Sequence, residues 1–386
     1  MRVFVIAGEA SGDCLGAALM AGLKTLKEVE FHGIGGPMMA KQGLTSLFEM
    51  DELSLMGLVE VLPKYFALRR RLTQTVAAVL KARPDVLITI DSPGFCLRVA
   101  KQVKAESDIR TVHYVAPSVW AWRPKRAGKM AQYIDQVLAL LPFEPPLMQA
   151  AGMACDFVGH PIMAETPPTG GQITEFKEKY AIGNSPVLLV LPGSRCSEVA
   201  RLAPIFGKAL IPVLARHPDI RVVIPTTPSV AGLVKKAVED WAIIPLILDP
   251  NEMKDEVYHT EKASLFHLAN WALAASGSVS LELAKAKTPM LIAYDMNRIS
   301  RVILSKMLRV DTVTLVNLVT QTHAVPECIG KACKAENITA KLLKLIENSG
   351  DQPEAMAQTV QILAGDGGAP GLRAAKAVLE GLNAPT

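Results

Sequence analysis

Short aliphatic runs that end in Gly, Pro or Asp alternate with helical stretches along most of the chain. Runs made almost wholly of Val, Ile, Leu and Ala are typical of strands buried on both faces, as in a parallel sheet covered by crossover helices. The pattern therefore predicts an α/β chain built from βαβ units. The predicted strands are 2–7, 31–35, 85–90, 110–115, 136–141, 156–158, 187–191, 221–224, 245–248, 271–275 and 290–294.

A stretch rich in Pro and Gly, residues 166–171, interrupts this alternation, which then starts again. A length of 386 residues also fits two domains. We expect two doubly wound, Rossmann-like domains at 1–165 and 172–345, with C-terminal helices over 350–386 that could return to the first domain. Open α/β sheets bind ligands at the carboxyl ends of their strands, so the two domains should face a shared cleft.

Composition narrows the function classes. The apolar runs are far shorter than the roughly 18 residues that span a bilayer. A net charge of +4 without a lysine-rich tail disfavours nucleic-acid binding. The six cysteines form no CxxC pair, which favours buried reduced thiols and no metal site. No signal peptide precedes the first strand, so we expect a cytoplasmic protein.

The loop after the first strand carries four candidate binding residues, Gly8, Ser11, Gly12 and Asp13. Glycines at this place let backbone amides approach a ligand at a helix N-terminus. The loop lacks the GxGxxG pattern, which disfavours a nicotinamide dehydrogenase. The alternative is a tight turn in which Ser11 or Asp13 caps the helix.

Asp91 follows a strongly aliphatic strand and precedes a turn. A carboxylate at the carboxyl end of a strand is placed to act as a general base toward a hydroxyl. The alternative is that Asp91 caps the next helix, which runs through Leu97, Ala100 and Val103.

Two loops of small residues follow the strands at 187–191 and 271–275. Such loops at helix N-termini suit the phosphates of a nucleotide, with Arg195 neutralising charge. Glu282, one helical turn further on, could accept a hydrogen bond from a ribose, or be an ordinary acidic residue of a first helical turn. Neither loop is a Walker motif, so an ATPase is disfavoured. The small residues concerned are Ser194, Ser276, Gly277 and Ser278.

A basic amphipathic helix is expected over 65–80, and a double-tryptophan segment precedes Arg123, Lys125 and Arg126. The helix fits contact with a membrane interface or an acyl chain, and the tryptophan segment fits a patch at the level of lipid headgroups or a phosphate pocket. The alternatives are a core-facing helix with a solvated basic side and packing at a domain interface. The residues assigned to this contact are Tyr65, Phe66, Leu68, Arg69, Leu72, Trp120 and Trp122.

Six segments together closely resemble the lipid-A-disaccharide synthase family of inverting glycosyltransferases (family 19). The resemblance implies two Rossmann-like domains of the GT-B type, and catalysis without metal or cofactor. The implied reaction transfers 2,3-diacylglucosamine from UDP to the 6-hydroxyl of 2,3-diacylglucosamine 1-phosphate, giving a β-1,6-linked disaccharide and UDP. The segments are 8–13, 56–62, 90–93, 113–122, 191–195 and 316–318.

The resemblance also implies roles for single residues. Asp91 matches an essential aspartate and is a candidate base, whereas Arg195, Glu282 and Asn317 match positions of the nucleotide-sugar site. Ser11 lies in the loop expected near the sugar. Peripheral association with the inner membrane and a homodimer with exchanged C-terminal segments are implied as well.

Two other functions stay open at this point. One is a different UDP-sugar enzyme of the same fold, another glycosyltransferase or a UDP-N-acetylglucosamine 2-epimerase; the epimerase would need no lipid acceptor, so the helix at 65–80 counts against it. The other is a non-catalytic membrane-surface protein, which would tolerate the loss of Asp91.

Overall fold

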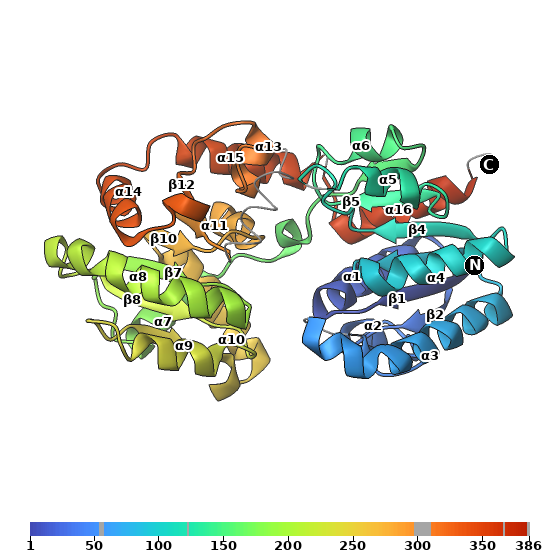
Figure 1. Cartoon of the computed structure of the whole chain (residues 1–386), viewed down its shortest axis with the longest axis horizontal. Helices are drawn as coiled ribbons and strands as arrows, with labels where there is room; N and C mark the ends of the chain where they lie inside the picture. Colours follow the sequence, from blue (N-terminus) through green and yellow to red (C-terminus); the bar gives the residue numbers. More distant parts are fainter. Residues whose placement is uncertain (54–57, 122, 297–309, 366, 384–386) are drawn as a thin grey trace. The chain divides into compact units, whose positions relative to one another are not determined.

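The computed structural model describes residues 1–53, 58–121, 123–296, 310–365 and 367–383, with the backbone only for 58–65. The chain forms two compact units. Unit 1 combines residues 1–164 with the segment that begins at Leu363, and unit 2 is Glu165–Ile362. Among the described residues, each unit is built around one six-stranded parallel sheet whose strands alternate with helices (Figure 1). This confirms the predicted α/β class with two Rossmann-like domains.

The helices and strands of unit 1 lie close to the predicted positions. They are β1 (Arg2–Ala7), α1 (Ala10–Leu26), β2 (Glu30–Ile34), α2 (Pro37–Lys41), η1 (Met50–Glu52), α3 (Leu58–Ala82), β3 (Val86–Ile90), α4 (Pro93–Glu106), β4 (Arg110–Tyr114), α5 (Lys125–Met130), β5 (Gln136–Ala139), α6 (Pro145–Gln149), β6 (Ala154–Phe157), η2 (Pro161–Ala164) and α16 (Pro370–Asn383).

Unit 2 repeats the alternation, and α15 runs across the boundary between the two units. Its elements are α7 (Gly170–Lys179), β7 (Val187–Leu191), α8 (Cys196–Arg216), β8 (Arg221–Pro225), α9 (Ala231–Val238), β9 (Leu246–Leu248), η3 (Pro250–Glu252), α10 (Asp255–Leu268), β10 (Trp271–Ala274), α11 (Val279–Ala286), β11 (Met290–Tyr294), α13 (Leu315–Thr320), β12 (Glu327–Ile329), η4 (Gly330–Ala332), α14 (Ala335–Glu347) and α15 (Gln352–Ala364). The sequence analysis missed β12, because three residues pairing with the edge of β11 show no periodic pattern.

The strand order places one switch point in each sheet. Unit 1 has the order β2-β1-β3-β4-β5-β6, and unit 2 has β12-β11-β10-β7-β8-β9. The order reverses between β1 and β3 in unit 1 and between β7 and β10 in unit 2. Because open α/β sheets bind ligands where the strand order reverses, the loops that follow these four strands are where a site is expected.

The cores consist of aliphatic strands that are covered on both faces. All residues of β3, for example, have no exposed surface. The expectation of buried thiols holds for Cys96, Cys155, Cys328 and Cys333 but is wrong for two others. Cys14 is exposed on α1, and Cys196 is exposed at the first position of α8. None of the helices in the described parts of the chain is long and apolar enough to cross a membrane.

Helix α16, drawn in red in Figure 1, belongs to unit 1 and packs against α1. The contact depends on glycines, because a Cβ added to Gly371 would lie 2.4 Å from the carbonyl oxygen of Ala18. A Cβ added to Gly22 would in turn lie 2.7 Å from the carbonyl oxygen of Gly371. The side-chain amide of Gln136 on β5 also donates a hydrogen bond of 2.9 Å to the Ala377 carbonyl oxygen. The last helix is therefore part of the core of unit 1.

We expect Gly371→Ala to lower the free energy of unfolding by about 1–3 kcal/mol, because the added methyl group meets backbone atoms that cannot give way. Gly128→Ala is the matched control, since a Cβ there has no atom within 4 Å and alanine is the better helix former. Urea unfolding of both variants measures the difference. Equal stability of the two variants would contradict the proposed close packing.

Candidate functional site

The loops after β1 and β3 touch at the switch point of unit 1. A Cβ added to Gly8 would lie 2.5 Å from the Ser92 Oγ atom, so the two loops can approach this closely only with glycine at that position. Gly12 packs against the sheet, where its Cβ would lie 3.4 Å from that of Ala7. Ser11 is exposed on the first turn of α1. Gly8 and Asp91, predicted from separate segments, are thus brought to one edge of the sheet.

The backbone at this edge is strained. Asp91 and Ser92 have φ values of 47° and 40°, and Val115 after β4 has a φ of 80°. Left-handed conformations of this kind cost energy in residues with a Cβ and cluster at functional sites. Two hydrogen bonds of 3.0 Å hold them, from the Asp91 N–H to the Tyr114 carbonyl and from the Val115 N–H to the Leu138 carbonyl.

Asp91 has the electrostatics of a base. Burial raises the pKa of its carboxyl group, and a hydrogen bond from the Ser92 backbone offsets part of this rise. The alternative that Asp91 caps the next helix is wrong, because Ser92 holds the N-cap position of α4. A half-buried carboxyl group with a raised pKa at a strand end suits proton abstraction.

Asp13 has a structural role that the sequence analysis did not predict. Its carboxylate accepts hydrogen bonds from the backbone N–H groups of Gly36 at 2.8 Å, Met38 at 2.8 Å and Met39 at 3.0 Å. The residue is buried, and it ties the start of α2 to α1. The assignment of Asp13 to substrate binding is therefore not supported. The alternative that Ser11 or Asp13 caps α1 is also wrong, since Glu9 is its N-cap.

A pocket of about 690 Å³ opens beside the Asp91 loop. It joins two regions that the sequence analysis treated separately, the start of α4 and the basic helix α3. Phe66, also on α3, has 77% of its surface exposed. Of the other predicted contact residues, Trp122 and the side chain of Tyr65 lie outside the described residues. The lining residues are Glu9, Leu53, Leu68, Arg69, Leu72, Ser92, Pro93, Gly94, Phe95 and Arg98.

Trp120 is anchored within unit 1. Its Nε1–H donates a hydrogen bond of 3.3 Å to Glu144 Oε1, and its ring stacks edge-on against Phe143 with centroids 5.3 Å apart. Glu144 is buried and also accepts a hydrogen bond of 3.0 Å from the Leu141 N–H. Burial raises the pKa of Glu144 to about 7. Because its polar end is turned toward Glu144, Trp120 does not support the predicted membrane contact.

In unit 2, a cavity of about 350 Å³ lies at the switch point between β7 and β10. The two predicted loops hold the N-cap positions of the helices that follow, with Arg195 at α8 and Ser278 at α11. Five of the predicted residues line this cavity, namely Ser194, Ser276, Gly277, Ser278 and Glu282. Further lining residues that the sequence analysis missed include Thr226, Tyr258, His259 and Lys262.

Charged side chains at this cavity are paired with one another. Lys262 Nζ lies 2.5 Å from Glu282 Oε2, and Arg195 Nη1 lies 3.1 Å from Glu198 Oε1. The Arg195 side chain is 66% exposed and is not among the residues that line the cavity. The contact to Glu198 uses Nη1, so the predicted phosphate contact would need Arg195 to turn toward the cavity or to bind the anion through its remaining N–H donors.

The side-chain amide of Asn317 forms its hydrogen bonds within residues 312–325. Its Nδ2 donates to Thr312 Oγ1 at 3.1 Å and to the Val325 carbonyl at 2.9 Å, while its Oδ1 accepts from the Val325 N–H at 2.9 Å. The Ser276 hydroxyl donates to the Val313 carbonyl, in the same segment, at 3.3 Å. Asn317 therefore does not line the cavity, but the segment that it holds accepts a hydrogen bond from Ser276, which does.

Similarity to known proteins identifies the family of this chain. A family described as lipid-A-disaccharide synthetase matches residues 3–374. The chain belongs to this family. A lipid-A-disaccharide synthase of Ruegeria pomeroyi is 57% identical over 383 residues, covering 99% of this chain and 96% of the relative. One of Rhodospirillum centenum is 42% identical over 386 residues, covering 98% and 94%. The enzyme is thus a glycosyltransferase of lipid A biosynthesis.

Solved structures show the same fold at low identity. A UDP-GlcNAc 2-epimerase of Neisseria meningitidis, bound to UDP-GlcNAc, has a TM-score of 0.64 at 14% identity and covers 99% of both chains. The S. aureus MnaA–UDP co-structure has a TM-score of 0.66 at 14% identity, covering 98% of this chain and 94% of that one. These likenesses support the two-Rossmann fold of the glycosyltransferase and nothing beyond it.

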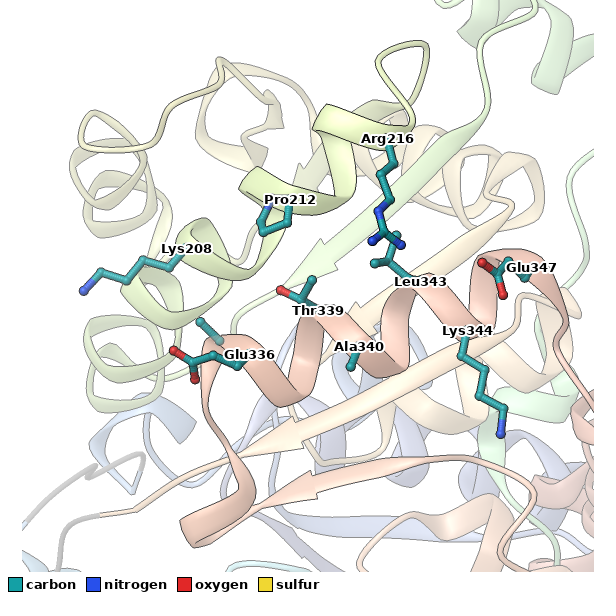
Figure 2. A pocket seen from close by; sticks show the side chains of 10 residues that line it. Lys208, Pro212, Arg216, Glu336, Thr339, Ala340, Leu343, Lys344 and Glu347 are labelled. Atoms are coloured by element: carbon teal, nitrogen blue, oxygen red, sulfur yellow. The ribbon is translucent and has the colours of Figure 1, made fainter.

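A groove between α8 and α14 is a poor candidate for the substrate site of this glycosyltransferase. It measures about 680 Å³, and Lys208, Pro212 and Arg216 of α8 line one side of it while residues of α14 line the other, with the Arg216 side chain reaching toward Leu343 (Figure 2). The Thr339 hydroxyl donates a hydrogen bond of 2.8 Å to the Ala209 carbonyl. The groove is lined by the C-terminal half of α8 and by α14, and no loop that follows a strand contributes to it.

The buried Glu144 predicts a pH-dependent stability. A carboxyl group whose pKa is higher in the folded than in the unfolded chain stabilises the fold only while it is protonated, so stability falls as the pH rises from the ordinary glutamate range through about 7. We expect Glu144→Gln to be more stable than wild type by about 1–3 kcal/mol at about pH 8, with the difference closing near pH 4.

Urea unfolding across this pH range measures the effect. Glu106→Gln, at an exposed position at the end of α4, serves as the control and should follow the wild-type curve. Parallel stability curves for wild type and Glu144→Gln would contradict a buried, titrating Glu144.

Proposed function

We propose that this lipid-A-disaccharide synthase works by direct, inverting transfer, with no metal ion or cofactor. The donor, UDP-2,3-diacylglucosamine, would bind in unit 2, and the acceptor, 2,3-diacylglucosamine 1-phosphate, in unit 1. The single observation that carries the proposal is Asp91, a half-buried carboxyl group of raised pKa on a strained turn at the switch point.

The donor would bind in the cavity of unit 2. As the bond between the sugar and UDP breaks, negative charge grows on the diphosphate. The N-termini of α8 and α11 present backbone N–H groups and the positive ends of their dipoles, which stabilise such charge. Arg195, at the N-cap of α8, would leave Glu198 and pair with the diphosphate. Glu282 lines the same cavity and is placed to meet the ribose hydroxyls.

The acceptor hydroxyl would react with the help of Asp91. In the proposed step, the acceptor 6-hydroxyl oxygen forms a bond to the anomeric carbon of the donor as the bond to the UDP oxygen breaks. The hydroxyl proton passes to the Asp91 carboxylate, and UDP leaves with the bonding electron pair. Attack from the face opposite UDP inverts the anomeric centre. The raised pKa brings the base closer to the operating pH, which favours proton transfer.

We also propose that the enzyme acts at the cytoplasmic surface of the inner membrane. Both substrates carry acyl chains, and Phe66 presents a large apolar side chain to solvent close to Arg69 on the same helix. An exposed aromatic residue beside cations is suited to a membrane interface. A homodimer with exchanged C-terminal segments is part of the proposal on the family resemblance alone.

We expect Asp91→Asn to lower the rate of disaccharide formation by about 10²–10⁴-fold, because the amide cannot accept the proton, while UDP binding is retained. UDP release and the mass of the lipid product, measured in detergent without divalent metal, report turnover. The wild-type rate should fall as the pH drops through the pKa of Asp91, at a higher pH than for an ordinary aspartate.

Asp108→Asn is the matched control, since this aspartate is exposed after α4 and should keep full activity. Near-normal turnover of Asp91→Asn would remove Asp91 as the base. UDP release by wild type without any disaccharide would refute the proposed acceptor.

Phe66→Ser should weaken the binding of the protein to anionic lipid vesicles by about tenfold, as expected from the burial of one large apolar side chain. Ile244→Ser controls for general loss of surface apolarity, because Ile244 is fully exposed on unit 2. Vesicle co-sedimentation measures both. An equal effect of the two variants would contradict a specific role of α3.

A further inference from the structure

The pocket beside Asp91 combines an apolar wall with two arginines. Leu68 and Leu72, one turn apart on α3, line it together with Phe95 of α4, and Leu53 adds to the apolar surface. Arg69 enters the lining from α3 and Arg98 from α4. Apolar surface and cations within one pocket suit a ligand that has both a hydrocarbon part and an anionic group.

No ion pair joins Arg69 or Arg98 to a carboxylate in the described parts of the chain, and Glu9 is the acidic residue among those that line the pocket. The neighbouring Arg71 shows the contrast, because its guanidinium pairs with Glu52 at 2.6 Å and lies over the ring of Phe48 at 4.5 Å. Arg69 and Arg98 are exposed at the pocket and have no such ion pair in the described parts of the chain. Their charge is available to a bound anion.

Arg98 lies on the helix that begins next to Asp91. Helix α4 begins at Pro93, immediately after Asp91 and Ser92, and Arg98 follows five residues later. Five residues of α-helix advance about 7.5 Å along the axis. Gly94 and Arg98 lie on one face of α4, and a Cβ at Gly94 would have no atom within 4 Å, so the surface of the helix at Gly94 is open.

We propose that Arg69 and Arg98 bind the phosphate of the acceptor sugar and thereby hold its 6-hydroxyl at Asp91. The inference rests on the proposed function and adds the recognition of one substrate to it. Guanidinium groups donate paired hydrogen bonds to phosphate oxygens, and two of them match a phosphate monoester better than one. The two arginines would then select a phosphorylated acceptor over the same lipid with a free 1-hydroxyl.

Steady-state kinetics in detergent, on the full chain, test this with two acceptors, 2,3-diacylglucosamine 1-phosphate and its form without phosphate. We expect Arg69→Gln and Arg98→Gln each to raise the KM for the phosphorylated acceptor about tenfold or more. The KM for the UDP-sugar and the kinetics with the dephosphorylated acceptor should stay unchanged. Arg98→Lys should restore part of the preference, since lysine keeps the charge but loses the paired geometry.

Lys81→Gln on α3 and Lys101→Gln on α4 remove equal charge from exposed positions outside the pocket, and both should behave as wild type. Unchanged melting temperature and UDP binding verify that each variant folds, and the two arginines lie on different helices, so one variant suffices if the other does not fold.

Disaccharide formation with an undiminished preference for phosphate in both arginine variants would overturn the inference and leave the proposed function standing. A loss confined to the binding of phospholipid vesicles would overturn it as well, since bilayer headgroups would then be the ligand. Failure of wild type to join either acceptor would remove the proposed function, and the inference with it.

Discussion

A parallel sheet that is buried on both faces confines polar chemistry to the ends of its strands. Within the sheet of unit 1, the side chains of Thr89 and His113 satisfy each other through a hydrogen bond of 2.8 Å. Burial, with a contribution from Arg126, lowers the pKa of His113 to about 3, so this imidazole is neutral and inert at physiological pH. Asp91 lies only two residues beyond Thr89, yet it is past the end of β3 and reaches the edge where the loops meet. In this unit, a polar side chain is therefore open to a ligand only past the end of the strand.

The two halves of the candidate site are prepared in different ways. In unit 1, Asp91, the proposed base, lies on strained backbone that a hydrogen bond to the neighbouring strand β4 keeps in place, so the proposed proton transfer would need little reorganisation. In unit 2, Lys262 and Arg195 are already paired with Glu282 and Glu198. In the proposed mechanism, a diphosphate would compete with these carboxylates for the two cations. The proposed acceptor site therefore rests on the conformation of the backbone, whereas the proposed donor site contains side chains that are already ion-paired.

Much of this architecture could be predicted from the sequence, because alternating aliphatic runs and small-residue loops are local signals. The positions of Asp91, Ser194 and Glu282 at strand ends or first helical turns followed from such signals. The direction in which each side chain points could not be predicted from these local signals. The partners of Asp13 lie more than twenty residues further along the chain, and Trp120 turns toward Glu144 at a similar separation. A motif identifies a residue as important without indicating whether it faces a ligand or the protein.

Asn317 of unit 2 is another residue that a motif identified and whose side chain faces the protein. The segment that it closes is also held by Glu327, whose Oε1 accepts hydrogen bonds from the backbone N–H groups of Val313 at 3.0 Å and Thr314 at 2.8 Å. The Val313 carbonyl in turn accepts a hydrogen bond from the hydroxyl of Ser276, which lines the cavity of unit 2. Loss of the Asn317 amide would therefore disturb the proposed nucleotide site through the loop that carries Ser276. A residue can be required at a nucleotide-sugar site because it fixes the backbone behind the contact, and its burial, with all its hydrogen bonds inside the protein, indicates that role.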